Sequence, residues 1–160
     1  MRQSGAVGSV ADSLELKVPP AVVAGLAGVA QWFLTRRRRR TMPLGAAAAA
    51  SLAAAGVTVG VQGIVGFQRA RTTVHPQHPE QSTALVTDGV YARTRNPMYV
   101  AMGLGLLGVA AFTGRAVALL PIVGYVAWLD RFQVQPEERV LAERFGEVYD
   151  DYRQHVRRWV

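Results

Sequence analysis

The chain has 160 residues, of which 50% are hydrophobic, and its 18 Lys and Arg against 11 Asp and Glu give a formal net charge of +7. Because it contains no cysteine, disulfides, thiolate zinc sites and cysteine nucleophiles are excluded. The excess arginines stand beside uncharged apolar runs, so we expect them to contact anionic lipid headgroups rather than nucleic acid.

Four uncharged apolar runs follow a leader of mixed charge. About 20 helical residues cross the ~30 Å hydrocarbon layer of a bilayer, and the second run alone exceeds that length. We therefore predict an all-α integral membrane helical bundle of about four transmembrane helices with a C-terminal amphipathic helical tail. The prediction divides the chain into a flexible leader at 1–17 and a single domain at 18–160, with spans at about 18–34, 43–67, 97–113 and 116–131.

Small residues recur along the second span. Gly56 and Gly60 form a GxxxG pattern, which lets two helices approach closely in lipid, unless small residues are simply frequent in this alanine-rich run. The polar loop after this span contains His75 and His78. Each precedes a proline and so belongs to extended chain, and no third ligand of matching type is near. We expect no metal site.

The segment from 85 to 99 ends where the third apolar run begins. We expect a turn at Gly89, extended chain through Tyr91 and Arg95, and a helix that starts at Pro97. Two guanidiniums would then lie beside free helix N–H groups, which is an arrangement that receives anions. The alternative is that Arg93 and Arg95 only anchor a helix end at lipid headgroups.

The tail after the last span is amphipathic. We expect a helix to begin at Pro136 and to stop at Gly146, with apolar residues at helical spacing beyond it. Glu137 and Glu138 lie in the first turn of that helix. They serve either its dipole or a functional site, and the pattern alone does not decide between the two.

The distribution of basic residues sets the expected orientation. The block at 36–40 by itself would be cytoplasmic by the positive-inside rule. With the N-terminus inside, however, twelve of the 18 basic residues are cytoplasmic, namely Arg2, Lys17, Arg69, Arg71, Arg93, Arg95, Arg131, Arg139, Arg144, Arg153, Arg157 and Arg158. We therefore predict a multi-pass protein of the inner, cytoplasmic membrane whose segments 85–99 and 135–159 face the cytoplasm.

Two blocks of the sequence, 86–99 and 136–159, resemble the isoprenylcysteine carboxyl methyltransferase family and its phospholipid methyltransferase-like bacterial relatives. That family shares a G-x-Y-x-x-x-R-H-P-x-Y segment, a hydrophobic hairpin, and paired glutamates followed by F-G-x-x-Y-x-x-Y. The corresponding positions here run from Gly89 to Tyr99 and from Glu137 to Tyr152. The family histidine is Asn96 in this chain, and an amide can hydrogen-bond but cannot titrate near neutral pH.

The resemblance implies an S-adenosylmethionine-dependent methyltransferase that releases S-adenosylhomocysteine. The residues it assigns to the cofactor are Gly89, Tyr91, Arg95, Asn96, Pro97, Tyr99, Glu138, Tyr149 and Tyr152. Arg95, Glu138 and Glu137 are the catalytic candidates: the arginine suits a carboxylate, and a glutamate suits an ammonium, a hydroxyl or the role of general base. His75 is a weaker candidate for the base.

The methyl acceptor is open at this stage. A lipophilic acceptor that enters from the bilayer is expected, and a thiol, an amine or a carboxylate is each compatible with the residues. The alternative function is a catalytically silent membrane scaffold or lipid-binding protein of the same fold, which the substitution at Asn96 favours. No oligomeric state follows from the sequence.

Overall fold

The computed structural model describes residues 14–36, 43–71 and 83–160, and every regular element in this part of the chain is a helix. The long helices are α2 (Pro20–Thr35), α3 (Pro43–Arg69), α4 (Pro97–Thr113) and α5 (Leu120–Leu129), and the chain ends with α6 (Gln135–Phe145) and α7 (Glu147–His155). This confirms the predicted all-α class. Residues 1–13 of the expected leader, the arginines at 37–40 and the histidines at 75 and 78 lie outside the described residues.

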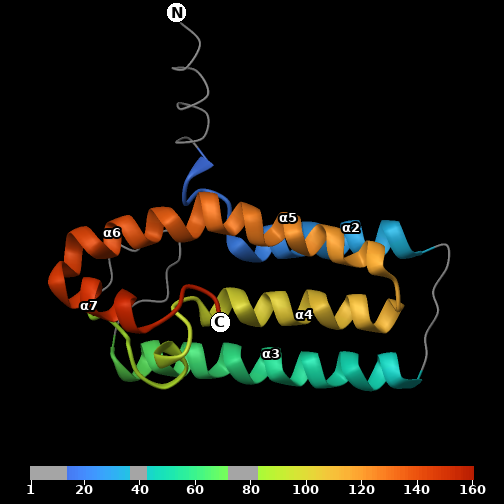
Figure 1. Ribbon diagram of the computed structural model, residues 1–160, viewed down its shortest axis with the longest axis horizontal. Helices are drawn as coiled ribbons and strands as arrows, with labels where there is room; N and C mark the ends of the chain where they lie inside the picture. The colour runs from blue at the N-terminus through green and yellow to red at the C-terminus, as the bar shows by residue number, and fades with distance from the viewer. Residues whose placement is uncertain (1–13, 37–42, 72–82) are drawn as a thin grey trace, which may run out of the picture.

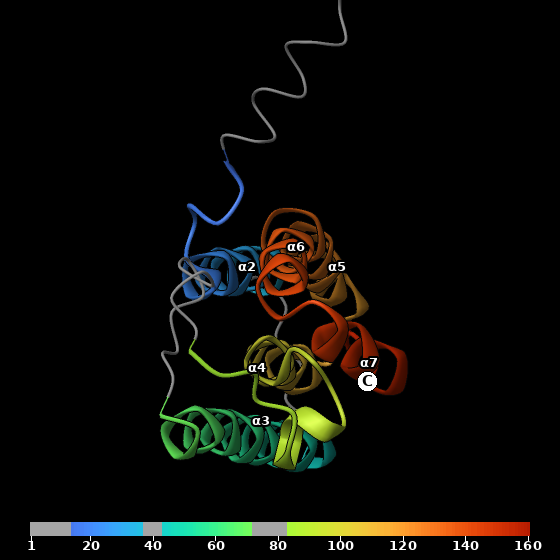
Figure 2. The ribbon, with the colours of Figure 1, turned by 90° about the vertical axis from the view of Figure 1, so that its left-hand side faces the viewer.

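The helices form layers around α4. α3 lies on one side of α4, while α2 and α5 lie together on the other side, as the end-on view shows (Figure 2). The described part of the loop before α4, residues 83–96, lies with α6 and α7 at one end of the bundle (Figure 1). The α4–α5 turn, the end of α2 and the start of α3 lie at the opposite end.

The outer surface of the bundle is apolar. α3, with 27 residues, and a continuous helix at Ala116–Phe145, with 30, are long and apolar enough to cross a membrane, whereas α2 and α4 are apolar but shorter. Only 6% of the apolar window of α3 is buried, so α3 is not the core helix of a soluble protein. Large side chains such as Leu26, Val57 and Val123 point outward. The protein is therefore a helical membrane bundle.

The sequence predicts a tail helix that begins at Pro136, but in the structure Pro136 lies inside a longer continuous helix. A 3₁₀ turn at Ala116–Leu119 (η3), α5, a π-helical turn at Asp130–Val134 (η4) and α6 follow one another without a break. Pro136 has no N–H to donate to the carbonyl of Phe132, and the backbone N–H of Leu16 takes that place at 3.0 Å. The π turn bonds the N–H of Gln135 to the carbonyl of Asp130. The freed backbone groups are thus satisfied, and the helix continues through the proline.

Close packing of α3 on α4 depends on the glycine pattern. A Cβ placed on Gly56 would lie 2.9 Å from the backbone oxygen of Ala101, whereas a Cβ on Gly60 would make an ordinary contact, 3.5 Å from the Cβ of Ala101. Backbone cannot yield as a flexible side chain can, so the glycine at 56 sets the distance between the two helices. The interpretation as a helix-packing motif is therefore the better one for Gly56.

We expect Gly56→Ala to destabilise the folded protein by about 1–3 kcal/mol, because the added methyl group forces α3 and α4 apart. Thermal unfolding in detergent micelles measures the effect. Gly105→Ala is the matched control, since Gly105 lies on α4 and a Cβ there meets nothing within 4 Å. Equal unfolding temperatures for the two variants would contradict the packing argument.

Candidate functional site

The site begins in the loop before α4. Gly89 has a φ of +60°, so the turn predicted there exists, but Gly89–Ala92 then forms a short 3₁₀ helix (η2) and not the extended chain that the sequence had indicated. Tyr91 packs edge-on against Phe67 of α3, with 5.3 Å between ring centroids. Asn96 has a non-helical φ of −127°, and Pro97 occupies the first turn of α4, as predicted.

A cavity of about 450 Å³ lies between this loop and the C-terminal helices. That volume suits a small-molecule ligand. Its wall includes eight of the nine predicted cofactor residues and both predicted glutamates: Tyr91, Arg95, Asn96, Pro97, Tyr99, Glu137, Glu138, Tyr149 and Tyr152. Gly89 is not part of the wall, and its place is in the turn that leads to it. Segments some forty residues apart in the sequence therefore meet at one cavity.

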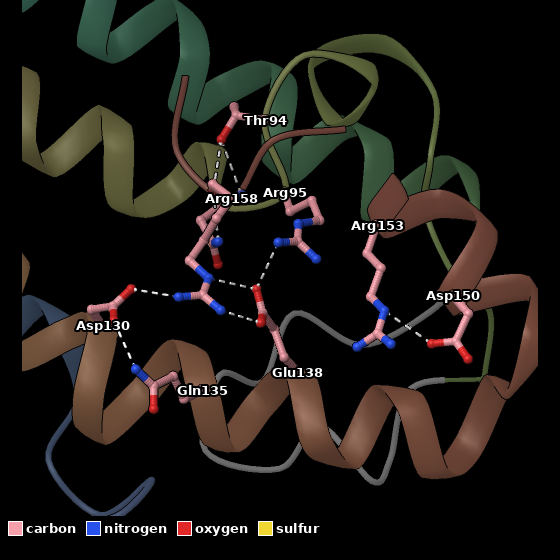
Figure 3. A network of polar contacts seen from close by, with 9 residues as sticks. Thr94, Arg95, Asp130, Gln135, Glu138, Asp150, Arg153 and Arg158 are labelled. Atoms are coloured by element: carbon pink, nitrogen blue, oxygen red, sulfur yellow. Dashed lines mark hydrogen bonds and ion pairs between the residues drawn. The ribbon is translucent and has the colours of Figure 1, made fainter. Parts of the chain in front are cut away.

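Glu138 is held between two guanidiniums (Figure 3). Its Oε1 lies 3.2 Å from Nη2 of Arg95, and Arg158 donates from Nε and Nη2 to its two oxygens at 2.9 and 2.7 Å. The side chains of Arg95 and Glu138 are only 12% and 18% exposed, so these charges interact with little screening by water. Both oxygens of Glu138 are thus engaged by guanidiniums, and Arg158 also pairs with Asp130.

Glu137 has neutral partners instead. The Tyr99 hydroxyl donates to its Oε1 at 2.6 Å, and the Nε2 amide of Gln133 donates to the same oxygen at 2.7 Å. Both donors are themselves buried, with 6% and 2% exposure. In the part of the chain that the structure describes, no ion pair to Glu137 is found. A carboxylate at this position is oriented but not neutralised, and it favours a positive charge in the cavity.

Two tyrosines of α7 complete the polar wall. Burial raises the pKa of Tyr149 to about 12 and the pKa of Tyr152 above its ordinary value, so both remain hydroxyls at neutral pH. The Tyr152 hydroxyl donates to the Tyr91 carbonyl at 2.7 Å and so fastens α7 to η2. α7 can reach this position because Gly146 takes φ +53° and ψ −128°, a conformation open essentially to glycine alone, and turns the chain after α6.

Arg95 retains capacity for a further anion. Its Nε is a buried nitrogen that has no hydrogen-bond partner among the described residues. A buried donor without a partner is costly in an empty site and is satisfied when an acceptor arrives. The polar groups of this cavity, a guanidinium with the Tyr149 hydroxyl and a carboxylate that has no ionic partner among the described residues, suit a ligand with both an anionic and a cationic group, such as the aminocarboxylate and sulfonium of S-adenosylmethionine.

Asn96, which replaces the histidine of the family pattern, has a defined partner. Its Nδ2 donates to the backbone carbonyl of Arg158 at 2.9 Å, and its backbone N–H bonds Thr94 Oγ1 at 3.2 Å. The side chain therefore holds the C-terminal segment against the loop. This is a task for a hydrogen-bond donor and requires no titration near neutral pH.

Several site residues were missed by the sequence interpretation. Gln133 was missed because the predicted helix start at Pro136 hid its i,i+4 relation to Glu137, which exists only in the continuous helix. Arg158 and Asp130 carry no local signal, since their pairing joins positions far apart in the chain. Much of the unforeseen wall is apolar and comes from the start of α2, from α3 and from α4, including Pro19, Pro20, Ala21, Gly60, Ile64, Phe67, Ala101 and Met102.

Within residues 14–36, 43–71 and 83–160, no group of three or more His, Asp or Glu is arranged to hold a metal ion. The two histidines of the polar loop lie outside these ranges, so the expected absence of a metal site stays a prediction.

Comparisons with known proteins agree on one family. A sequence profile of the family described as phospholipid methyltransferase matches residues 44–148, a range that begins in α3 and ends in α7. The chain is similar to an uncharacterized protein of Haemophilus influenzae, with 35% identity over 63 residues, which is 39% of this chain and 100% of that protein. It is also similar to a protein-S-isoprenylcysteine O-methyltransferase of Schizosaccharomyces pombe, with 38% identity over 73 residues. That match covers 45% of this chain and 30% of the Schizosaccharomyces pombe protein. Solved structures gave no significant match.

Proposed function

The chain belongs to the phospholipid methyltransferase family, and on that premise we propose that it is an integral membrane methyltransferase with S-adenosylmethionine as its methyl donor. The observation that supports this most is the shared cavity, in which Arg95 has an unpaired buried nitrogen and Glu137 has no cationic partner among the described residues. The cavity wall thus offers one group suited to an anion and another suited to a cation, as a ligand with a carboxylate and positive charges requires.

When bound, S-adenosylmethionine supplies an activated methyl group on a positively charged sulfur. In our proposal Arg95 binds the carboxylate of the methionine moiety, and the rings of Tyr149 and Tyr152 contact its uncharged parts. Glu137 stabilises positive charge within the cavity, and its orientation is fixed by Tyr99 and Gln133. The enzyme's contribution is then mainly alignment and electrostatics, with no covalent enzyme intermediate.

A proton acceptor is required only when the methyl acceptor arrives protonated. Glu137 is the better candidate of the two glutamates, because Glu138 is already bonded to two guanidiniums. Taking a proton at Oε2 of Glu137 leaves Oε1 free to keep its bonds from Tyr99 and Gln133.

The acceptor is proposed to be lipophilic. The wall opposite the charged residues is made of apolar side chains from the start of α2 and the end of α3, and α3 presents apolar side chains outward. A molecule dissolved in the bilayer could therefore contact the cavity through its hydrocarbon part. Thiol, amine and carboxylate acceptors each remain compatible with this arrangement.

Calorimetric titration of the detergent-purified protein with S-adenosylmethionine and S-adenosylhomocysteine tests the proposal. We expect both to bind. Methyl-labelled cofactor incubated with the protein and total membrane lipids or small thiols should then give labelled product. Binding without label transfer to any acceptor would favour the catalytically silent scaffold, and absence of binding would reject the proposed function.

The orientation is part of the proposal, with the cavity on the cytoplasmic side of the inner membrane. Because the chain has no cysteine, a single introduced cysteine is the one thiol of the protein that a maleimide can label. We expect Asp88→Cys, in the exposed loop beside the cavity, to react with an impermeant maleimide only in inside-out vesicles. Ala116→Cys, in the connection between α4 and α5 at the opposite end of the bundle, should react only in right-side-out vesicles. The reverse pattern would place the site outside.

A further inference from the structure

The last residues of the chain form a segment, Val156 to Trp159, that lies against the loop before α4. The carbonyl of Arg157 accepts from the backbone N–H of Arg95 at 3.0 Å. The carbonyl of Arg158 accepts from Asn96 Nδ2 at 2.9 Å and from Thr94 Oγ1 at 3.3 Å. Three consecutive loop residues therefore bond the backbone of this segment, which fixes the direction in which its side chains leave.

That direction brings the Arg158 side chain to Glu138, a residue of the cavity wall (Figure 3). Its guanidinium binds both oxygens of Glu138, and Nη1 binds Asp130 Oδ1 at 3.0 Å. Asp130 is itself held by Gln135, whose Nε2 donates to Oδ2 at 2.8 Å. Arg158 thus joins the π turn to α6, and its two carboxylate partners raise its pKa. A guanidinium that donates two hydrogen bonds to one carboxylate fixes the orientation of that carboxylate as well as pairing its charge.

The charge balance around Arg95 depends on this contact. With Arg158 in place, Glu138 accepts two hydrogen bonds from Arg158, and its contact with Arg95 is limited to one, of 3.2 Å, so Glu138 engages only part of the Arg95 guanidinium. Without Arg158, Arg95 would be the remaining guanidinium beside Glu138. A ligand carboxylate would then have to compete with Glu138 for the N–H groups of Arg95.

We propose that Arg158 is a positioning residue of the ligand site, which engages Glu138 so that Arg95 is left available to an anionic group in the cavity. The inference rests on the proposed function for the identity of that anion, the carboxylate of S-adenosylmethionine or S-adenosylhomocysteine. It adds the C-terminal segment to the site, beyond the 44–148 range of the family match.

Arg157 supplies a matched control, because its side chain is exposed and only its backbone contacts the loop. The test is titration of S-adenosylhomocysteine into the wild-type protein, Arg158→Ala, Arg158→Lys and Arg157→Ala, with thermal unfolding of each ligand-free protein. We expect Arg158→Ala to weaken binding about tenfold, as for loss of one partner in a partly buried charge pair, and Arg157→Ala to bind as the wild type. Arg158→Lys keeps the charge but not the fork and should fall between them.

A double-mutant cycle separates positioning from a general loss of structure. If Arg158 acts through Glu138, then Arg158→Ala should change affinity less than about threefold in a Glu138→Gln background, where the charge it balances is gone. An undiminished loss in that background, or wild-type affinity of Arg158→Ala, would overturn the inference while leaving the proposed function intact. Failure of the wild-type protein to bind would reject both.

Should Arg158→Ala fail to fold, Arg158→Lys decides the question within the same cycle. An affinity equal to that of the wild type would contradict the proposal, because a single ammonium cannot reproduce the two bonds to Glu138 together with the bond to Asp130.

Discussion

Arg95→Ala is expected to remove binding of S-adenosylmethionine and S-adenosylhomocysteine, with an affinity loss of at least about 30-fold, or about 2 kcal/mol, typical of truncating one partner of a buried charge pair. The fold should persist, because Glu138 keeps both bonds from Arg158 and is not left as an unpaired buried charge. Calorimetric titration measures the affinity, and thermal unfolding of the ligand-free protein measures the fold.

Arg93→Ala is the control for this experiment. Arg93 lies two residues earlier in the same loop, has the same charge, and is exposed. If Arg93 and Arg95 both serve only to hold the helix end at lipid headgroups, the two substitutions will have similar effects on binding. Unchanged affinity of Arg95→Ala would reject the assigned site.

Glu137→Gln has the second large expected effect. The amide keeps an oxygen for the Tyr99 hydroxyl and the same shape, but it removes the negative charge from the cavity. Loss of a charge that faces the ligand in a desolvated site should cost a cationic ligand about tenfold or more in affinity. S-adenosylhomocysteine, which lacks the sulfonium charge, should lose much less. The ratio of the two dissociation constants is the measurement.

Glu143→Gln is the matched variant on the same helix, since Glu143 is exposed and outside the cavity wall. It should leave both dissociation constants unchanged. If Glu137 serves only to stabilise the fold through Tyr99 and Gln133, Glu137→Gln will lower the unfolding temperature and leave the ratio of affinities as it was. That result would remove Glu137 from the proposed mechanism.

Local chemistry explains the features that the sequence predicted correctly. A helix made from a long uncharged run has no polar face to present to water. The helical membrane bundle therefore follows from these runs, whichever helices pack together. Gly89 and Pro97 each restrict their own backbone, and the turn and helix start they indicate are present. The cofactor residues were assigned through the resemblance of two short motifs to a known family, and eight of those nine residues line one cavity.

The errors have equally physical causes. A proline at 136 read alone indicates a helix start, but a π turn and the N–H of Leu16, over a hundred residues earlier, satisfy the groups it frees. Pro97 favours extended chain in the residue before it, and the sequence therefore predicts extended chain between Gly89 and Pro97. In the structure Tyr91 packs on Phe67, and residues 89–92 form a 3₁₀ turn. In both cases contacts distant in sequence outweighed a local preference.

The sequence by itself determined that this protein is a helical membrane protein and which two segments carry its polar chemistry, because hydrophobic runs and backbone-restricting residues act over a few positions. Only the tertiary structure decided how the charges are paired. Glu137 and Glu138 are adjacent and identical in the chain, yet one faces a hydroxyl and an amide and the other two guanidiniums. Partners supplied by distant segments set the electrostatics of a buried carboxylate, and no local pattern encodes them.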